Sequence, residues 1–222
     1  PTTLVCMENT HNGAGGRIVD PANIRAVTEL ARSLGISTHL DGARLMNASM
    51  GSGRSARDIA APFDTVSLCL SKGLGAPVGS VLSGSKEVIA RAYRFRKMYG
   101  GAMRQAGVLA AAGLYALDHH VERLAEDHRR ARHLAEQLAG TSGLSVELES
   151  VQTNLVYFDI DADHPLAAAD AEGAPLLVQR LQEQGVRIAG GGTRMRAVTH
   201  LDLDDADLEG AIGVIVRLMT SS

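Results

Sequence analysis

Short apolar runs recur along the first part of the chain, and each is bounded by polar or turn-forming residues. Such runs predict strands. They lie at Thr3–Met7, Ile36–Leu40, Thr65–Leu70 and Val78–Leu82. Between the first two runs, apolar residues recur at helical spacing from Ile24 to Leu34, behind an Asp20-Pro21 pair that is typical of a helix start. Strands that alternate with helices indicate an α/β layer with a mostly parallel sheet.

The pattern changes in the second half of the chain. From Arg104 to Ala139 the apolar positions form one recurring helical stripe, which Gly140–Gly143 ends. Shorter strands and helices then predict a compact α+β domain. The strands are expected at Leu144–Leu148, Thr153–Ile160, Val186–Ala189 and Met195–Thr199, and the helices at Pro175–Gln184 and Asp205–Met219. We therefore predict three parts: an α/β layer over 1–102, a connecting helical segment over 103–142 and a small C-terminal α+β domain over 143–222.

The composition narrows the class of protein. The 222 residues are 45% hydrophobic and 21% charged, which is the ordinary globular range. With a net charge of −3 and no tryptophan, the chain offers no basic, aromatic surface, so we expect no nucleic-acid partner. The longest apolar run, Gly107–Leu117, is too short to span a bilayer, so we expect no membrane segment. Cys6 and Cys69 form no zinc or disulfide framework, which favours the cytoplasm.

Lys72 stands out among the three lysines of the chain. It follows the predicted strand that ends at Leu70 and opens the glycine-containing turn 73–77, whereas Lys86 and Lys97 lie on a charged helical stretch. Ligands bind at the carboxyl edge of open α/β sheets. A lysine that is partly desolvated there has a lowered pKa and can attack a carbonyl carbon. A solvated surface lysine is the alternative interpretation.

Asp41 occupies a similar position at the end of the strand before it. The alternatives are a helix N-cap or an ion pair with Arg44. Together with Lys72 it forms the combination that pyridoxal phosphate requires, because the lysine binds the cofactor covalently and the acid keeps the pyridine nitrogen protonated. We therefore predict a pyridoxal phosphate site at this edge of the sheet.

Five ordered motifs make the resemblance specific. They are Glu8-Asn9-Thr10-His11-Asn12, His39-Leu40-Asp41-Gly42-Ala43-Arg44, Ser71-Lys72-Gly73-Leu74-Gly75-Ala76-Pro77-Val78-Gly79, Gly100-Gly101-Ala102-Met103-Arg104-Gln105 and Arg196-Ala197-Val198-Thr199-His200-Leu201-Asp202. With these motifs the chain resembles the low-specificity L-threonine aldolases over essentially its whole length. The resemblance implies the aspartate-aminotransferase-like architecture, fold type I of the pyridoxal phosphate enzymes, with 1–102 as the C-terminal part of the cofactor-binding large domain.

The resemblance also implies a role for each matching residue. Lys72 matches the lysine that binds the cofactor covalently, and Asp41 matches the acid at the pyridine nitrogen. Arg44 and Arg196 match arginines that hold the substrate carboxylate, a role that suits the guanidinium fork. Arg104 matches a residue near the cofactor phosphate, expected to reach a site in a neighbouring subunit. The loop with His11 and Asn12 could border the site.

The implied activity is aldol cleavage of L-threonine or L-allo-threonine to glycine and an aldehyde. An aminotransferase, a β-eliminating lyase or a non-catalytic subunit of the same fold are the competing hypotheses. The resemblance further implies a homotetramer, built from dimers that share active sites. Members of the family begin earlier than this sequence, so we expect the phosphate-cradling segment and a histidine that stacks on the cofactor ring to lie outside the given residues.

Two other signals carry less weight. The glycine runs 13–16 and 190–192 lack the spacing and the downstream acid of a dinucleotide-binding loop, so we interpret them as turns. A group of histidines on the long helical stretch lacks the spacing of a metal site, and we expect it on a solvated face. It consists of His119, His120, His128 and His133.

Overall fold

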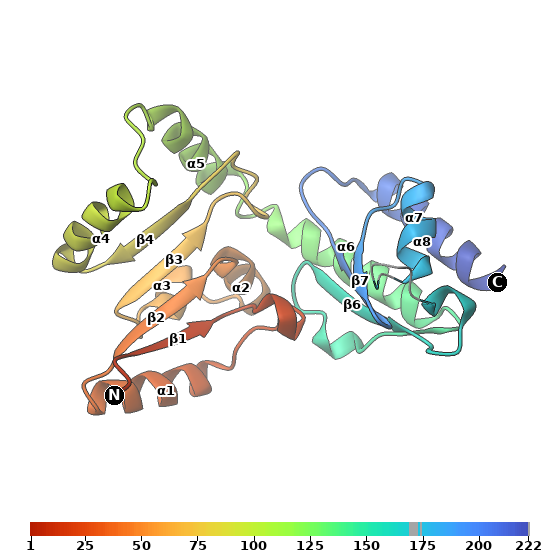
Figure 1. The fold of residues 1–222 in the computed structure, drawn as a ribbon, viewed down its shortest axis with the longest axis horizontal. Coiled ribbons are helices and arrows are strands. Elements are labelled where there is room, and N and C mark those ends of the chain that lie inside the picture. The colour runs from red at the N-terminus through yellow and green to blue at the C-terminus, as the bar shows by residue number, and fades with distance from the viewer. Residues whose placement is uncertain (169–172, 174, 222) are drawn as a thin grey trace. The chain divides into compact units, whose positions relative to one another are not determined.

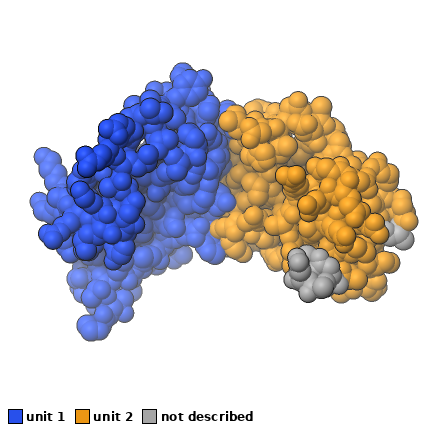
Figure 2. Space-filling model, turned by 45° about the horizontal axis from the view of Figure 1, so that its top comes forward, with its two compact units in different colours: residues 1–11, 18–124 blue, residues 12–17, 125–222 orange. Residues whose placement is uncertain are grey.

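The computed structural model describes residues 1–168, 173 and 175–221. The chain forms two compact units, coloured separately in Figure 2. The first contains Pro1–His11 and Ile18–Leu124, and the second contains Asn12–Arg17 and Ala125–Ser222. The boundary at Leu124 falls inside the segment 103–142 that was expected to connect two domains. The predicted three-part division of the chain stays a prediction.

The first unit is built on a four-stranded sheet in the order β1-β2-β3-β4 (Figure 1). Strands β1 (Leu4–Glu8), β2 (Ser37–Gly42) and β3 (Thr65–Cys69) run parallel, and β4 (Ser80–Gly84) pairs antiparallel with β3. The predicted α/β layer with a mostly parallel sheet is therefore confirmed.

Within the described residues, the first unit contains five helices, and some of them pack against the sheet through small apolar clusters. They are α1 (Pro21–Ser33), α2 (Leu45–Ser52), α3 (Ala56–Ala60), α4 (Lys86–Met98) and α5 (Gly107–His119). Helix α1 begins as predicted, because the Asp20 carboxylate accepts a hydrogen bond from the Ala22 amide at 2.8 Å. One cluster joins Leu40 of β2 to α2 and α3, and a second packs the turn after β3 against α5.

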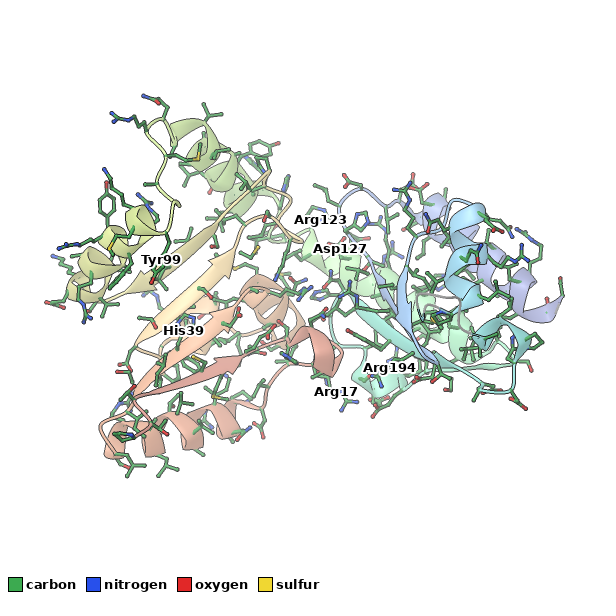
Figure 3. The ribbon with its side chains drawn as sticks, viewed as in Figure 1. Arg17, His39, Tyr99, Arg123, Asp127 and Arg194 are labelled. Carbon is green, nitrogen blue, oxygen red and sulfur yellow. The ribbon has the colours of Figure 1, made fainter. Side chains whose placement is uncertain are left out.

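The part of the first unit around β4 and α4 is poorly covered. Every residue of β4 is exposed, and α4 buries no side chain. Large apolar side chains consequently face solvent, among them Tyr99 at the end of α4, which is 84% exposed (Figure 3). An apolar surface of this kind is typical of protein interaction sites. Among the described residues, no helix is both long and apolar enough to cross a membrane.

The second unit contains an antiparallel sheet in the order β5-β6-β8-β7. Its strands are β5 (Leu144–Ser145), β6 (Leu155–Ile160), β7 (Ala189–Gly191) and β8 (Arg194–Val198), and its helices are α6 (Leu124–Ala139), α7 (Leu176–Glu183) and α8 (Asp205–Thr220). The helices pack on one face of the sheet around Phe158, Met195 and Leu138, all almost fully buried. The compact α+β unit is therefore as predicted.

Three local predictions differ from the structure. The strand expected at Leu144–Leu148 is limited to Leu144–Ser145, and Leu148 begins a 3₁₀ helix. The single helical stretch expected over 104–139 is divided into α5 and α6, with the break at His120–Arg123. The strand expected at Val186–Ala189 lies at Ala189–Gly191, so two glycines assigned to a turn belong to β7. Gly190 is required there by packing, because a methyl group at this position would lie 2.5 Å from the Met195 sulfur.

His128 is half-buried on α6, and the solvated face predicted for it is wrong. Burial lowers the pKa of its imidazole, and the adjacent Asp127 carboxylate offsets this shift only in part. The unfolded chain, with the usual pKa of 6.5, therefore binds a proton more readily than the folded chain. The stabilising contribution is fully present above that value and is lost as the pH falls through the folded pKa.

We predict that His128→Gln flattens the loss of stability on acidification. As the pH falls below about 6.5, wild-type protein should lose unfolding free energy, and the variant should lose less over the same interval. Urea unfolding at several pH values measures the difference. His119→Gln, at an exposed position, serves as the control and should follow the wild-type curve. Parallel curves for wild type and His128→Gln would contradict the prediction.

Candidate functional site

The carboxyl ends of three parallel strands lie along one edge of the first sheet. Strand register places Glu8 of β1 beside Asp41 of β2, and Asp41 beside Ser67 of β3. Asp41 is half-buried, and its Oδ1 accepts a hydrogen bond from the Ala43 amide at 3.0 Å. This bond fixes the carboxylate over the turn that follows β2. The predicted acid therefore lies at the sheet edge where ligands of such folds bind.

Arg44 precedes α2 directly and is half-buried. Its carbonyl oxygen accepts a hydrogen bond from the Thr10 hydroxyl at 3.3 Å, so the loop after β1 holds the backbone of Arg44. Thr10 is fully buried and has a φ of 57°, a conformation that β-branched residues rarely adopt. Such strain persists where surrounding contacts enforce it, often at functional sites. The sequence placed Thr10 in a motif, but no local signal indicates its backbone conformation.

Lys72 lies in a tight turn after β3 and is exposed. The Gly75 amide donates to the Lys72 carbonyl at 2.8 Å, and the Ala76 amide donates to the Leu70 carbonyl at 2.9 Å. Lys72, Arg44 and Asn47 line the same narrow pocket, which has no room for a water molecule. The structure thus brings together two of the predicted site residues on the edge where Asp41 also lies.

His120 supports this turn from the end of α5. Its Nδ1 lies 2.6 Å from the Leu74 carbonyl oxygen, and because that oxygen can only accept, Nδ1 carries the hydrogen. The Leu74 side chain is buried against Ala116 and Leu124. His120 is therefore not the purely solvated residue that the sequence pattern suggested, and sequence reasoning missed its contact because the partners are 46 positions apart.

Arg196 lies in the second unit, on β8, and is half-buried. Its Nη1 donates to Asn12 Oδ1 at 2.9 Å, whereas Nε is buried and has no hydrogen-bond partner among the described residues. Arg104 is exposed in the loop between α4 and α5 and is not part of the pocket that Lys72 and Arg44 line. His11 is exposed, with Nε2 3.4 Å from Glu8 Oε2.

The side chains at the sheet edge fit pyridoxal phosphate by their chemistry. A lysine amine can bind the aldehyde carbon, a carboxylate can pair with the pyridine nitrogen, and a guanidinium can bind an anionic group. Asp41, Arg44 and Lys72 supply these three groups from neighbouring strands of one unit. Among the described residues, no cluster of histidine, cysteine and acidic side chains could hold a metal ion.

Comparison with known proteins agrees with this chemistry. A family model described as beta-eliminating lyase matches residues 1–161, which include Asp41, Arg44 and Lys72. The chain belongs to the beta-eliminating lyase family. It is 42% identical over 221 residues to a protein of Arabidopsis thaliana named probable low-specificity L-threonine aldolase 2, covering 99% of this chain and 61% of that protein. The resemblance inferred from the five motifs is confirmed.

A second relative from this family comes from a bacterium. The low specificity L-threonine aldolase of Escherichia coli K12 is 39% identical over 207 residues, covering 93% of this chain and 57% of that protein. The chain thus spans about three fifths of the length of the curated relatives it matches.

Solved structures with lower identity share the fold. Threonine aldolase from Leishmania major matches with a TM-score of 0.74 at 18% identity, covering 98% of this chain and 61% of that chain. Serine palmitoyltransferase from Sphingomonas wittichii matches with a TM-score of 0.71 at 19% identity, covering 99% and 55%. A PLP-dependent aminotransferase from Streptococcus suis matches with a TM-score of 0.72 at 16% identity, covering 99% and 58%. The predicted architecture of fold type I is therefore confirmed.

We predict that His120→Phe destabilises the first unit. The substitution keeps an aromatic ring but removes the Nδ1 hydrogen, so the Leu74 carbonyl loses its partner, at a cost of about 1–3 kcal/mol. Urea unfolding measures the change. His119→Phe, at the exposed neighbouring position, is the matched control and should change the unfolding free energy by less than about 0.5 kcal/mol. Equal effects of the two substitutions would show that the hydrogen bond from His120 to the Leu74 carbonyl contributes nothing to the free energy of unfolding.

Proposed function

We propose that the protein containing this chain is a pyridoxal phosphate-dependent lyase that cleaves β-hydroxy-α-amino acids. Its reaction is aldol cleavage of L-threonine or L-allo-threonine to glycine and acetaldehyde. The observation that carries the proposal is the shared pocket of Lys72 and Arg44, at the sheet edge where Asp41 also lies. The names of the relatives from Arabidopsis thaliana and Escherichia coli support the substrate class.

The residues of the first unit are proposed to hold and tune the cofactor. Lys72 binds the cofactor covalently through its Nζ, and the turn 70–76 holds it at the pocket. Asp41 keeps a proton on the pyridine nitrogen. When bound, pyridoxal phosphate accepts the electrons of the bond that breaks next to the amino group. The hydrogen bond from the Ala43 amide to Asp41 Oδ1 keeps the carboxylate oriented for this task.

Arg44 and Arg196 are proposed to bind the substrate carboxylate. A guanidinium forms two parallel hydrogen bonds with a carboxylate, so it fixes orientation as well as position. Fixing the carboxylate fixes which bond at Cα stands perpendicular to the cofactor ring. That choice selects aldol cleavage over transamination, because the broken bond must align with the ring's electron system.

We further propose a cytoplasmic homotetramer, built from dimers in which Arg104 reaches the cofactor phosphate of the neighbouring subunit. Two observations support an assembly. Arg104 is exposed, and the helices on either side of its loop expose large apolar side chains such as Tyr99 and Val108. The free cysteines Cys6 and Cys69 fit a reducing compartment.

Substitution of Lys72 tests the catalytic proposal. Lys72→Ala should remove most of the threonine cleavage, because the chain then lacks the amine that binds the aldehyde carbon of the cofactor. Borohydride reduction of the wild-type protein with pyridoxal phosphate should give one adduct, mapped by peptide mass to Lys72. Lys86→Ala and Lys97→Ala serve as matched controls and should retain both the activity and the adduct.

Product analysis separates the competing activities. Glycine and acetaldehyde identify the aldolase, whereas a keto acid or ammonia identifies an aminotransferase or a β-eliminating reaction. Unchanged cleavage in Lys72→Ala would refute the catalytic role of this lysine. Reduction that labels all three lysines equally would refute a specific cofactor site at Lys72.

Mixing inactive subunits tests the role of Arg104. If each site combines Lys72 of one subunit with Arg104 of its neighbour, a mixed dimer of Lys72→Ala and Arg104→Ala subunits contains one intact site. Random reassociation should then restore about a quarter of the wild-type activity. Each variant reassociated with itself is the control and should stay inactive. Absence of any recovery in verified mixed dimers would contradict a shared site.

A further inference from the structure

Arg196 lies on the face of the second sheet that the helices leave uncovered. Its neighbours in β8, Met195 and Ala197, point into the helix-covered core, and side chains alternate along a strand. Tyr157 of β6 pairs with Arg196 and therefore lies on the same face. Six residues from the start of the chain, Asn12–Arg17, belong to this unit although their sequence neighbours on both sides belong to the first.

The last two residues of the segment Asn12–Arg17 attach it to the rest of the second unit. Thr153 Oγ1 donates to the Gly16 carbonyl at 2.9 Å, and Arg17 forms an ion pair with Glu147. Gly16 is fully packed, because a methyl group there would lie 2.6 Å from Thr153 Oγ1 and 2.8 Å from Leu155 Cδ1. Figure 3 labels Arg17 in this segment and Arg194 at the start of β8.

These attachments hold Asn12 in front of the Arg196 side chain. Asn12 opens a short 3₁₀ turn, with its carbonyl accepting from the Gly15 amide at 3.1 Å. Its Oδ1 then accepts from Arg196 Nη1 at 2.9 Å. The neighbouring arginine on this face is held differently, since the guanidinium of Arg194 lies over the Tyr157 ring, 5.0 Å from its centroid. The two guanidinium groups are thus kept apart by different partners.

We propose that Asn12 is a positioning residue for Arg196, an inference that rests on the proposed function of Arg196 in binding the substrate carboxylate. Asn12 is neutral, so it restrains the guanidinium without cancelling its positive charge. Arg196 Nε is buried and has no partner among the described residues, so a hydrogen-bond donor of this side chain is already removed from water.

The physical gain comes from restricting the arginine before the substrate arrives. A free arginine side chain loses rotamer freedom when it binds, and this loss weakens binding. A side chain that Asn12 already holds loses less of that freedom, and the substrate carboxylate meets its donors in a fixed direction. An aspartate at position 12 would hold the guanidinium as well but would compete with the substrate for its charge.

Ligand binding to the complete protein loaded with pyridoxal phosphate tests the proposal. Two probes are compared: glycine, which has a carboxylate, and glycinamide, which replaces it by a neutral amide. The absorbance of the bound cofactor reports the Kd of each. Asn12→Ala should weaken glycine binding about tenfold and glycinamide binding less than about twofold, because only glycine uses Arg196.

The matched control removes a similar bond from an arginine elsewhere in the same unit. Arg217 Nη2 donates to Gln184 Oε1 at 2.6 Å, and both side chains are exposed. Gln184→Ala should leave the Kd values of both probes unchanged. Equal weakening of glycine and glycinamide in Asn12→Ala would mean that the substitution only disturbs the fold, and it would overturn the proposal. An unchanged Kd for glycine would overturn it as well.

Arg196→Ala separates this inference from the function on which it rests. If Arg196→Ala does not weaken glycine binding, the proposed role of Arg196 fails. If Arg196→Ala weakens glycine selectively and Asn12→Ala does not, only the role of Asn12 fails. A double-mutant cycle completes the test, because Asn12→Ala should have no further effect on the Kd of glycine once Arg196 is removed. A full additive effect in the double variant would contradict action through Arg196.

Discussion

The parallel pairing of β1, β2 and β3 is the constraint on which the candidate site depends. Parallel strands end at the same edge of a sheet, so residues that are far apart in the sequence lie next to one another along that edge. The register of β2 against β3 sets Asp41 beside Ser67, and the chain then needs only the turn after Cys69 to present Lys72. A shift of the register by one residue would turn Asp41 to the other face of the sheet. The buried Leu40 beside it opposes such a shift.

The two units support their candidate residues by different means. In the first, the Ala43 amide donates to the Asp41 side chain, and backbone hydrogen bonds fix the turn that contains Lys72. The hydroxyl of the strained Thr10 donates to the Arg44 carbonyl. In the second, the arginine stands on a regular strand, and a side chain from a distant part of the sequence restrains it. Turn geometry therefore positions Asp41 and Lys72, the groups proposed for the cofactor, whereas hydrogen bonds with distant residues hold Arg44 and Arg196, the groups proposed for the substrate.

Local patterns in the sequence predicted the helices and strands whose ends are marked by capping residues or by a change from apolar to polar residues. Asp20-Pro21 marked the start of α1, and the apolar runs marked the parallel strands, because burial and capping act over a few residues. The break between α5 and α6 was missed, since it contains no glycine or proline and its partner, Leu74, is distant in sequence. The contact of Asn12 with Arg196 was missed for the same reason, because 184 positions separate the two residues. Gly190 was misplaced because packing against Met195, not a turn, requires it.

Because Asn12–Arg17 belongs to the second unit, a truncated chain that contains only residues after Leu124 does not contain the whole second unit. The units exchange the chain at three junctions, beside His11, Arg17 and Leu124, so one cut cannot separate them. A fragment that begins at Ala125 would lack the carbonyl that the buried Thr153 hydroxyl binds and the glycine that lies against Leu155. It would also leave the guanidinium of Arg196 without its amide partner. Dissection at Leu124 would therefore yield a C-terminal fragment with an altered surface, and its ligand binding would not describe the intact unit.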